Sequence, residues 1–150
     1  MKKILLSLLM AAAVFSACKK EKDKPTTTTP PATMDGFVWK EDGGVQISAD
    51  SAFWTSWSNG TGIRAYKNGM ASFFEINWDG AGNTSTGGKD LAAGKGLTFL
   101  KDRDTYTNTG KETLTITGSG SDKLSGSFEV AVSGGSIKKL NGTFTNIPKR

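Results

Sequence analysis

The sequence contains no histidine and only one cysteine, and each scarcity excludes particular kinds of site. Without histidine there is no Ser-His-Asp triad, no Cys-His pair and no histidine-ligated metal. A single cysteine makes neither an intramolecular disulfide nor a thiolate zinc cluster. We therefore expect a protein that is not an enzyme of a conventional kind and that uses no metal and no cofactor.

Long hydrophobic runs are equally scarce, and the one present lies at residues 4–15, where only Ser7 interrupts it. Lys2 and Lys3 precede this run, and small residues follow it. A helix of this length rises about 18 Å, whereas the hydrocarbon core of a bilayer is about 30 Å thick. The pattern predicts a secretory signal peptide over residues 1–17 and argues against a membrane-spanning helix.

The single cysteine, Cys18, follows directly on Val14-Phe15-Ser16-Ala17. This segment resembles the lipobox of bacterial lipoproteins, although Phe15 stands where leucine is usual. The resemblance implies that Cys18 carries a diacylglycerol on its sulfur and an acyl chain such as palmitate on its amino group; an ordinary signal peptide is the alternative. Two or three acyl chains anchor a protein stably. We expect a lipid-anchored cell-envelope protein at the outer membrane, with its periplasmic or surface side left open.

Residues 18–33 differ sharply in composition from the rest of the chain. After Cys18 this segment has no apolar side chain larger than alanine, and it holds three of the four prolines. Such a segment buries no core. It predicts a disordered linker between the anchor and one domain over residues 34–150.

The net charge of +5 and the pI near 9.4 invite a nucleic-acid function. The excess of lysine, however, lies in the signal peptide and the linker: from residue 34 onward there are 13 basic and 12 acidic residues. A nearly neutral domain has no basic stripe to neutralise phosphates. We expect no nucleic-acid partner.

All 19 glycines lie within residues 34–150, where they separate short apolar stretches together with Ser, Thr and Asn. Turns at intervals of roughly 8 to 12 residues are typical of all-β sandwiches and barrels. We predict a single antiparallel all-β domain, either a β-sandwich or a small lipocalin-like barrel, of about eight strands.

The strongest local signal is Asn68-Gly69 between two β-rich runs, which predicts a two-residue hairpin turn. That turn pairs Ile63 with Phe74 and Arg64 with Phe73. Alternation then assigns two faces. The predicted core face holds Ile63, Ala65, Met70, Phe74, Ile76 and Trp78, and the opposite face holds Arg64, Tyr66, Phe73 and Glu75.

Further strands are predicted on both sides of this hairpin. The clearer ones cover residues 113–117, 123–132 and 137–147, with Leu114, Ile116, Leu124, Phe128, Val130 and Val132 pointing inward. Weaker ones cover residues 37–40, 45–49, 52–57 and 96–100. We expect a bulge at Asn141-Gly142, and one long loop over residues 79–95 with a helical turn near residues 90–93.

Three segments carry a family resemblance: residues 112–117, residues 123–128, and residues 141–148, which read Asn-Gly-Thr-Phe-Thr-Asn-Ile-Pro. They resemble the last strands of small Bacteroidetes putative lipoproteins that have a lipocalin-like all-β domain of unknown function. The resemblance implies a β architecture and a location in the cell envelope, and it brings no catalytic residues.

Carboxylates are the remaining route to catalysis without histidine. Glu75 and Glu129 fall within predicted strands, and Asp102 and Asp104 flank Arg103. A glycosidase needs two such groups at a set separation, which the sequence does not fix. The loop at residues 79–83 offers oxygen ligands but lacks the acidic pattern of an EF-hand, so we assign no metal site.

Aromatic residues crowd the first half of the domain, and alternation places Trp54 on the opposite face from Phe53 and Trp57. Exposed aromatic side chains form binding surfaces, whereas buried ones build cores. We predict Trp54, Tyr66 and Phe73 as candidate ligand-binding residues in a non-catalytic binding module for a glycan, a lipid or an envelope protein. A histidine-free hydrolase with an Asp/Glu pair and a purely structural envelope component are the alternatives.

Overall fold

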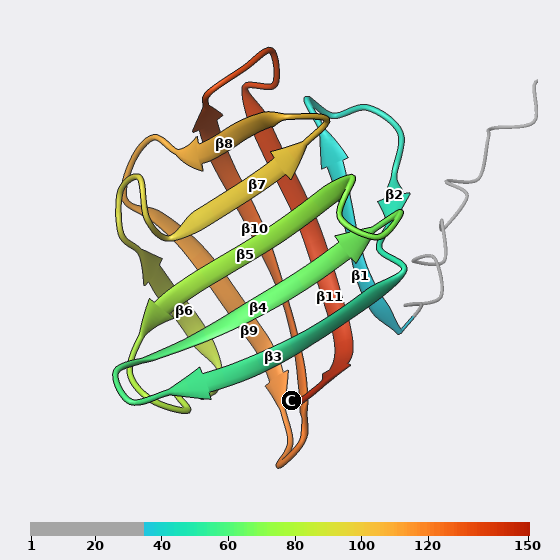
Figure 1. Cartoon of the computed structure of the whole chain (residues 1–150). Coiled ribbons are helices and arrows are strands. Elements are labelled where there is room, and N and C mark those ends of the chain that lie inside the picture. The colour runs from blue at the N-terminus through green and yellow to red at the C-terminus, as the bar shows by residue number, and fades with distance from the viewer. Residues whose placement is uncertain (1–34) are drawn as a thin grey trace, which may run out of the picture. The chain divides into compact units, whose positions relative to one another are not determined.

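The computed structural model describes residues 35–150, which form eleven β-strands (Figure 1). The predicted signal peptide, Cys18 and the linker lie outside these residues. Residues 35–150 contain no helix long and apolar enough to cross a membrane. The strands are β1 (Gly36–Glu41), β2 (Ile47–Ser48), β3 (Ser51–Trp57), β4 (Gly60–Lys67), β5 (Ser72–Asp79), β6 (Gly87–Leu91), β7 (Leu97–Lys101), β8 (Asp104–Asn108), β9 (Glu112–Ser119), β10 (Lys123–Ser133) and β11 (Lys139–Pro148).

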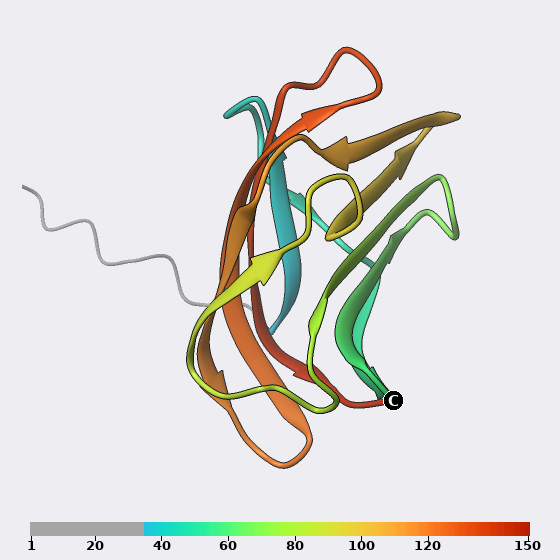
Figure 2. The same ribbon diagram turned by 90° about the vertical axis from the view of Figure 1, so that its left-hand side faces the viewer.

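The strands form two facing layers, and every pair of neighbouring strands is antiparallel. The front layer of Figure 1 has the order β3-β4-β5-β7-β8, and the back layer has the order β2-β1-β11-β10-β9-β6. The last two residues of β10, Val132 and Ser133, pair with β8 and so join the layers. The sheet curls into a half-barrel, seen from the side in Figure 2, which confirms the predicted all-β antiparallel fold.

The end of the chain joins the layers a second time. Lys149 forms a parallel bridge with Trp54, and the backbone N–H of Arg150 donates to the carbonyl of Trp54 at 2.9 Å. These contacts cover the outer edge of β3, which would otherwise present unpaired backbone groups.

Aromatic rings fill the space between the layers. Phe74 stacks on Phe99 with ring centroids 4.2 Å apart, Trp39 meets Phe74 edge-on at 5.0 Å, and Phe37 stacks on Phe128 at 5.5 Å. All five side chains are buried. Each buried aromatic removes about 150–250 Å² from water, so the nine buried aromatic residues contribute a large share of the apolar area of the core.

Two glycines in the back layer leave room for these rings. A Cβ on Gly142 would lie 2.7 Å from the ring of Phe128, and a Cβ on Gly126 would lie 2.5 Å from the ring of Phe144. Gly142 lies in an unbroken stretch of pairing, whereas the register shifts next to Gly126 in both of its pairings. The predicted bulge at Asn141-Gly142 is therefore wrong: both residues pair without a break, and Gly142 is there because a ring packs over it. The irregularity between β10 and β11 lies near Asn146, whose φ is 51°.

The Asn68-Gly69 turn is present, but its register differs from the prediction. Both residues have positive φ, as expected. The loop nevertheless spans four residues and pairs Lys67 with Ser72, so Arg64 faces Glu75 directly. The carboxylate of Asp50 stabilises this wider loop, because it accepts hydrogen bonds from Lys67 Nζ at 2.8 Å and from the Asn68 N–H at 2.6 Å. Those bonds hold the pKa of Asp50 below its ordinary value.

A shift of two residues leaves each side chain on its predicted face. Leu114, Ile116, Leu124, Phe128, Val130 and Val132 point inward as predicted, and so do Ile63, Ala65, Phe74, Ile76 and Trp78. Met70 is the exception: it lies in the loop and is 65% exposed.

Two strands were not predicted. Residues 87–91 form β6 where a loop with a helical turn was expected, and the polar residues 104–108 form β8. Leu91 and Tyr106 are each buried while their neighbours are polar. A strand with so few apolar residues forms because a neighbouring strand pairs with it. That pairing leaves no local pattern in the sequence.

The packing of Phe128 on Gly142 gives the first testable prediction. Gly142→Ala should lower the free energy of unfolding by about 1–3 kcal/mol, because the added methyl group meets both the ring and the carbonyl of Val38. Gly120→Ala is the matched control, since a Cβ at Gly120 meets nothing within 4 Å. Urea denaturation of both variants measures the difference, and equal stabilities would contradict the packing.

Candidate functional site

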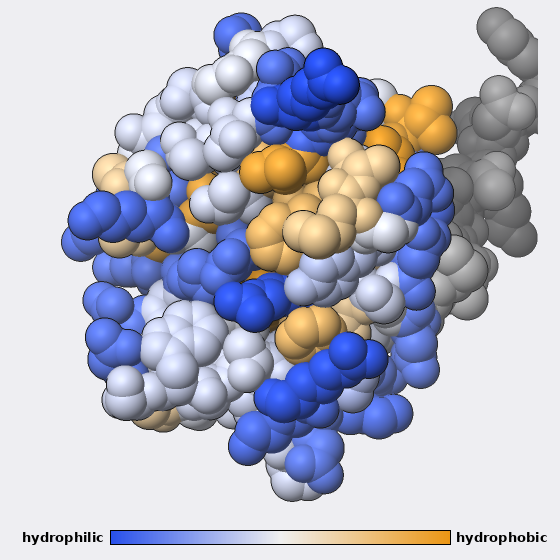
Figure 3. Space-filling view, viewed as in Figure 1, coloured by the Kyte–Doolittle hydropathy of each residue, from blue (hydrophilic) through white to orange (hydrophobic). Residues whose placement is uncertain are grey.

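The outer face of the front layer carries an apolar strip that runs across three strands (Figure 3). The rings of Phe53 and Tyr66 have centroids 6.1 Å apart, and those of Tyr66 and Phe73 are 5.1 Å apart. Leu100 pairs with Phe73 and extends the strip onto β7. The structure thus brings Tyr66 and Phe73 together on one open face, as predicted from alternation.

Trp54 does not lie with them. Its side chain points between the layers and is only 3% exposed, and its indole Nε1 has no hydrogen-bond partner within residues 35–150. Of the two neighbouring aromatics, Phe53 joins the strip and Trp57 lies near the end of β3. Trp54, the third candidate residue, is therefore a core residue. The tryptophan on the outer face is Trp57.

The rings of the strip partly cover one another. Centroid separations of 5–6 Å with planes inclined by 23° and 37° are within the range of offset stacking. The guanidinium of Arg150 covers part of Phe53, with its carbon 4.7 Å from the ring centroid. The strip consequently presents ring edges to solvent more than open ring faces.

A polar row borders the strip on its side toward Trp57. Arg64 donates to Glu75 Oε1 at 3.2 Å, and Asn77 Nδ2 donates to the same oxygen at 3.4 Å. The ion pair is half-exposed, so its contribution to stability is below about 1 kcal/mol. Because Arg64 holds the Glu75 carboxylate in place, the hydrogen bond from Asn77 to Glu75 fixes the orientation of the Asn77 amide.

Trp57 lies beyond this row, with its indole across the backbone of two glycines. A Cβ on Gly60 would be 2.5 Å from the indole nitrogen, and a Cβ on Gly62 would be 2.7 Å from Cη2. One side of the ring therefore rests on strand β4, where no side chain intervenes. The residue is nevertheless 38% exposed, which indicates that the other side of the ring meets solvent.

A hollow of about 240 Å³ adjoins this indole. It is lined by Trp57, Asn59, Gly60, Asn77, Trp78, Asp79, Asp90, Ala92, Lys95 and Gly96. Within residues 35–150 the Oδ1 of Asn77 is buried and accepts no hydrogen bond. The oxygen lies against Gly62 beside the Trp57 ring and is closed to solvent, so a ligand donor reaches it only when the amide turns outward. A buried acceptor without a donor costs about 1–3 kcal/mol, which such a turn would recover.

Asp79 and Asp90 line this hollow and also a neighbouring one that Trp78, Asn83 and Lys89 help to form. Both carboxylates are exposed, and Asp90 lies 3.6 Å from Lys111 Nζ. The carboxylates considered from the sequence are dispersed: Glu75 pairs with Arg64, Glu129 pairs with Lys139 at 2.7 Å, and Asp102 and Asp104 flank a tight turn. A glycosidase acid works from a desolvated site, which none of these carboxylates occupies.

The loop of residues 79–86 is held by its own hydrogen bonds. The hydroxyl of buried Thr61 donates to the Gly80 carbonyl at 2.7 Å and accepts from the Asn83 N–H at 3.0 Å. Lys89 Nζ donates to Asn83 Oδ1 at 3.0 Å, and Trp78 Nε1 donates to the Asn83 carbonyl at 2.7 Å. No cluster of three or more acidic or cysteine side chains that could hold a metal is found in residues 35–150.

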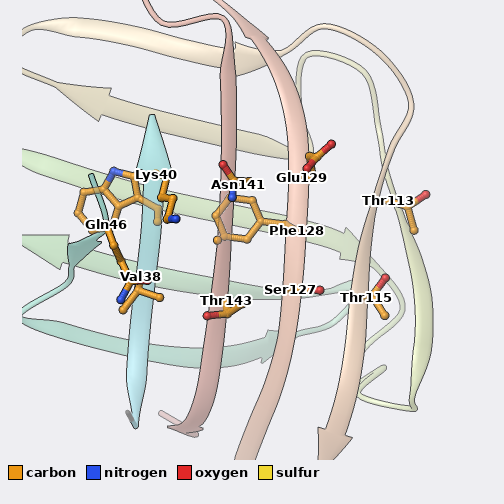
Figure 4. Close-up of a pocket in the computed structure, with 12 residues that line it drawn as sticks. Val38, Lys40, Gln46, Thr113, Thr115, Ser127, Phe128, Glu129, Asn141 and Thr143 are labelled. Carbon is orange, nitrogen blue, oxygen red and sulfur yellow. The ribbon is translucent and has the colours of Figure 1, made fainter. Parts of the chain in front are cut away.

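A larger hollow, of about 420 Å³, lies on the outer face of the back layer (Figure 4). Its side chains come from β1, β11, β10 and β9, together with Gln46. Most are polar: Lys40, Gln46, Thr113, Thr115, Ser127, Glu129, Asn141 and Thr143. The sequence pattern does not single out this site, because most of its lining residues are outward polar residues of amphipathic strands.

The domain therefore has two surfaces on which a ligand could rest, one on each layer. No protein-family model, no curated protein and no solved structure matches the chain. The function must accordingly be inferred from the chemistry of these two surfaces.

The hydrogen bonds of Thr61 give the second prediction. Thr61→Val preserves shape but leaves the Gly80 carbonyl and the Asn83 N–H without their partner, which should cost about 1–3 kcal/mol of stability. Amide exchange at Asn83 should accelerate accordingly. Thr55→Val, on the half-exposed outer face of β3, is the control and should change neither quantity. Unchanged exchange at Asn83 in Thr61→Val would show that the loop is held by other contacts.

Proposed function

We propose that the domain is a non-catalytic carbohydrate-binding module whose contact surface is the outer face of the front layer. The observation that supports this most directly is the position of Trp57, whose indole rests on Gly60 and Gly62 with its other side exposed. A sugar ring presents C–H groups on its faces, and a flat exposed indole accommodates such an apolar face. Ligand sites combine aromatic contacts of this kind with a few well-placed polar groups.

The polar groups beside Trp57 suit hydroxyls. Asn77 Oδ1 is an unoccupied acceptor, Glu75 is a carboxylate acceptor, and Lys95 is a donor in the same hollow as Asn77. A hydroxyl both donates and accepts, so a ring with neighbouring hydroxyls satisfies all three kinds of partner. The strip of Phe53, Tyr66 and Phe73 extends the face beyond the polar row, which gives room for more than one sugar unit.

A lipid or an envelope protein is a less suitable ligand for this face. The rings of the strip are half-buried and cover one another, so they do not protrude as membrane-inserting anchors do. A protein interface would place its large apolar anchors at the centre. Here an ion pair, Arg64–Glu75, occupies the centre of the face, between the strip and Trp57.

We further propose that the module is held at the cell envelope by lipid on Cys18, which the lipobox-like sequence before this residue supports. A binding domain on a lipid anchor would keep a glycan close to the membrane. The linker of residues 18–33 would separate the two.

Removal of the Trp57 side chain gives the third prediction. Neutral disaccharides such as cellobiose, maltose and mannobiose are titrated into ¹⁵N-labelled protein, and at least one should shift the amide of Asn77 and the indole N–H of Trp57. Trp57→Ala should weaken that binding about five- to thirtyfold, because loss of one aromatic contact costs about 1–2 kcal/mol. Asn77→Leu, which keeps the shape without the acceptor, should weaken it as well.

Phe37→Leu, a conservative change in the core remote from solvent, serves as the control for stability alone. If none of the three sugars shifts these signals at 50 mM, or if Trp57→Ala binds as the unaltered protein does, the proposal fails.

A histidine-free hydrolase is the second candidate, because Asp79 and Asp90 share the hollow beside Trp57 and Trp78. The same samples discriminate between the two functions. A binding module returns each disaccharide intact after prolonged incubation, whereas a hydrolase releases monosaccharide and loses that activity in Asp79→Asn or Asp90→Asn.

The anchor gives the fourth prediction. Cys18→Ala in the full chain should move the protein from the membrane fraction to the soluble fraction and abolish incorporation of labelled palmitate. Cys18 is the only cysteine, so the change removes no other thiol. Full retention in the membrane fraction would exclude the lipid anchor.

A further inference from the structure

We propose that the hollow on the outer face of the back layer is a second binding site, and that it takes an anionic saccharide, such as a hexuronic acid unit, rather than a neutral one. This site is separate from the Trp57 face, because the two lie on opposite layers (Figures 1 and 4).

The side chains of the hollow form two rows that the strand register fixes. In the first row Lys40, Asn141 and Glu129 are directly opposite one another on β1, β11 and β10. In the second row Val38, Thr143, Ser127 and Thr115 are aligned in the same way on β1, β11, β10 and β9. Figure 4 shows both rows on one face of the sheet. Side chains on paired strands of a sheet are held more precisely than those on loops, so these rows are organised before a ligand arrives.

The charge of the hollow favours an anion. Lys40 forms no ion pair within residues 35–150, whereas Glu129 pairs with Lys139 at 2.7 Å. Lys139 lies outside the lining of the hollow; counted with Lys40 and Glu129, it gives a net charge of +1, with Lys40 unpaired. Because Lys40 lies at the β1 end of the first row, a ligand carboxylate that binds to it would lie over β1.

The remaining groups favour a polyhydroxylated ligand over a simple anion. In the described part of the chain, the side chains of Gln46 and Asn141 make no hydrogen bond to another protein group, although each amide offers two donors and an acceptor. Ser127, Thr143 and Thr115 add hydroxyls along the second row. A phosphate or sulfate would occupy only the Lys40 end and leave these groups unused.

The dimensions agree with one sugar unit. Lys40 and Glu129 are separated by two strand spacings, about 9.6 Å, so a single pyranose can bond to groups at both ends of the row. The volume of about 420 Å³ lies in the range of small-ligand sites, about 300–1,000 Å³. Val38 supplies apolar contact for the ring carbons, and no exposed aromatic platform lines this hollow, so we expect millimolar affinity.

The test compares two ligands that differ only in one carboxylate: methyl β-glucuronide and methyl β-glucoside. Each is titrated into the ¹⁵N-labelled full chain at low salt, and the amides of Asn141, Thr143 and Ser127 are followed, with inorganic phosphate as a third probe. We expect the glucuronide to bind about five- to tenfold more tightly than the glucoside. In Lys40→Met the two should bind equally, whereas Lys123→Met, which removes a charge outside the hollow, should keep the preference.

Equal binding of the two glycosides by the unaltered protein, or no shift of these amides by either, would overturn the proposal. So would binding of phosphate as tight as that of the glucuronide, which would assign the site to a simple anion. The result is independent of the Trp57 face, because Trp57→Ala should leave these shifts unchanged.

Discussion

The structure depends on one packing relation, in which an aromatic ring lies against a glycine that has no side chain to obstruct it. Phe128 packs on Gly142, Phe144 on Gly126, and Tyr106 on Gly135. Nine of the 22 buried hydrophobic residues are aromatic, and they include the bulkiest side chains of the core. A ring that packs directly on the backbone comes closer to it than a Cβ would allow. Dispersion attraction is strongest at such close contact. Glycine at these three positions is thus a requirement of this core.

The same relation on the outer surface has a functional consequence. Gly126, Gly135 and Gly142 each face a buried ring, whereas Trp57 lies on Gly60 and Gly62 and is partly exposed. The glycines hold the indole in place without covering it. Asn77, fixed by its bond to Glu75, adds an unpaired acceptor next to the ring. The back layer instead presents mostly polar side chains in two rows, so the two faces are suited to ligands of different charge.

Much of this fold could be predicted from the sequence, and its failures have physical causes. Alternation in residues 63–78 and 123–132 gave the correct faces, since a buried face imposes a period of two on any strand. The register predicted at Asn68-Gly69 was wrong by two residues. Asp50, distant in sequence, accepts a hydrogen bond from the Asn68 N–H and so stabilises a wider loop. β6 and β8 were missed because pairing with β9 and β7 forms them. Tyr66 and Phe73 were placed on the correct face, and Trp57 was correctly set opposite Trp54, but neither Trp57 nor Asn77 was selected as a candidate, since the signal for them was the pair Gly60 and Gly62 opposite them.

The most direct test of this relation needs no ligand. An indole that rests on backbone shifts the nearby glycine protons upfield through its ring current, and nuclear Overhauser effects join the two. We predict upfield-shifted Hα signals for Gly60 and Gly62, with cross-peaks to the Trp57 ring, and loss of both features in Trp57→Ala. Hα shifts at ordinary values for these glycines, with no cross-peak to the indole, would contradict the account.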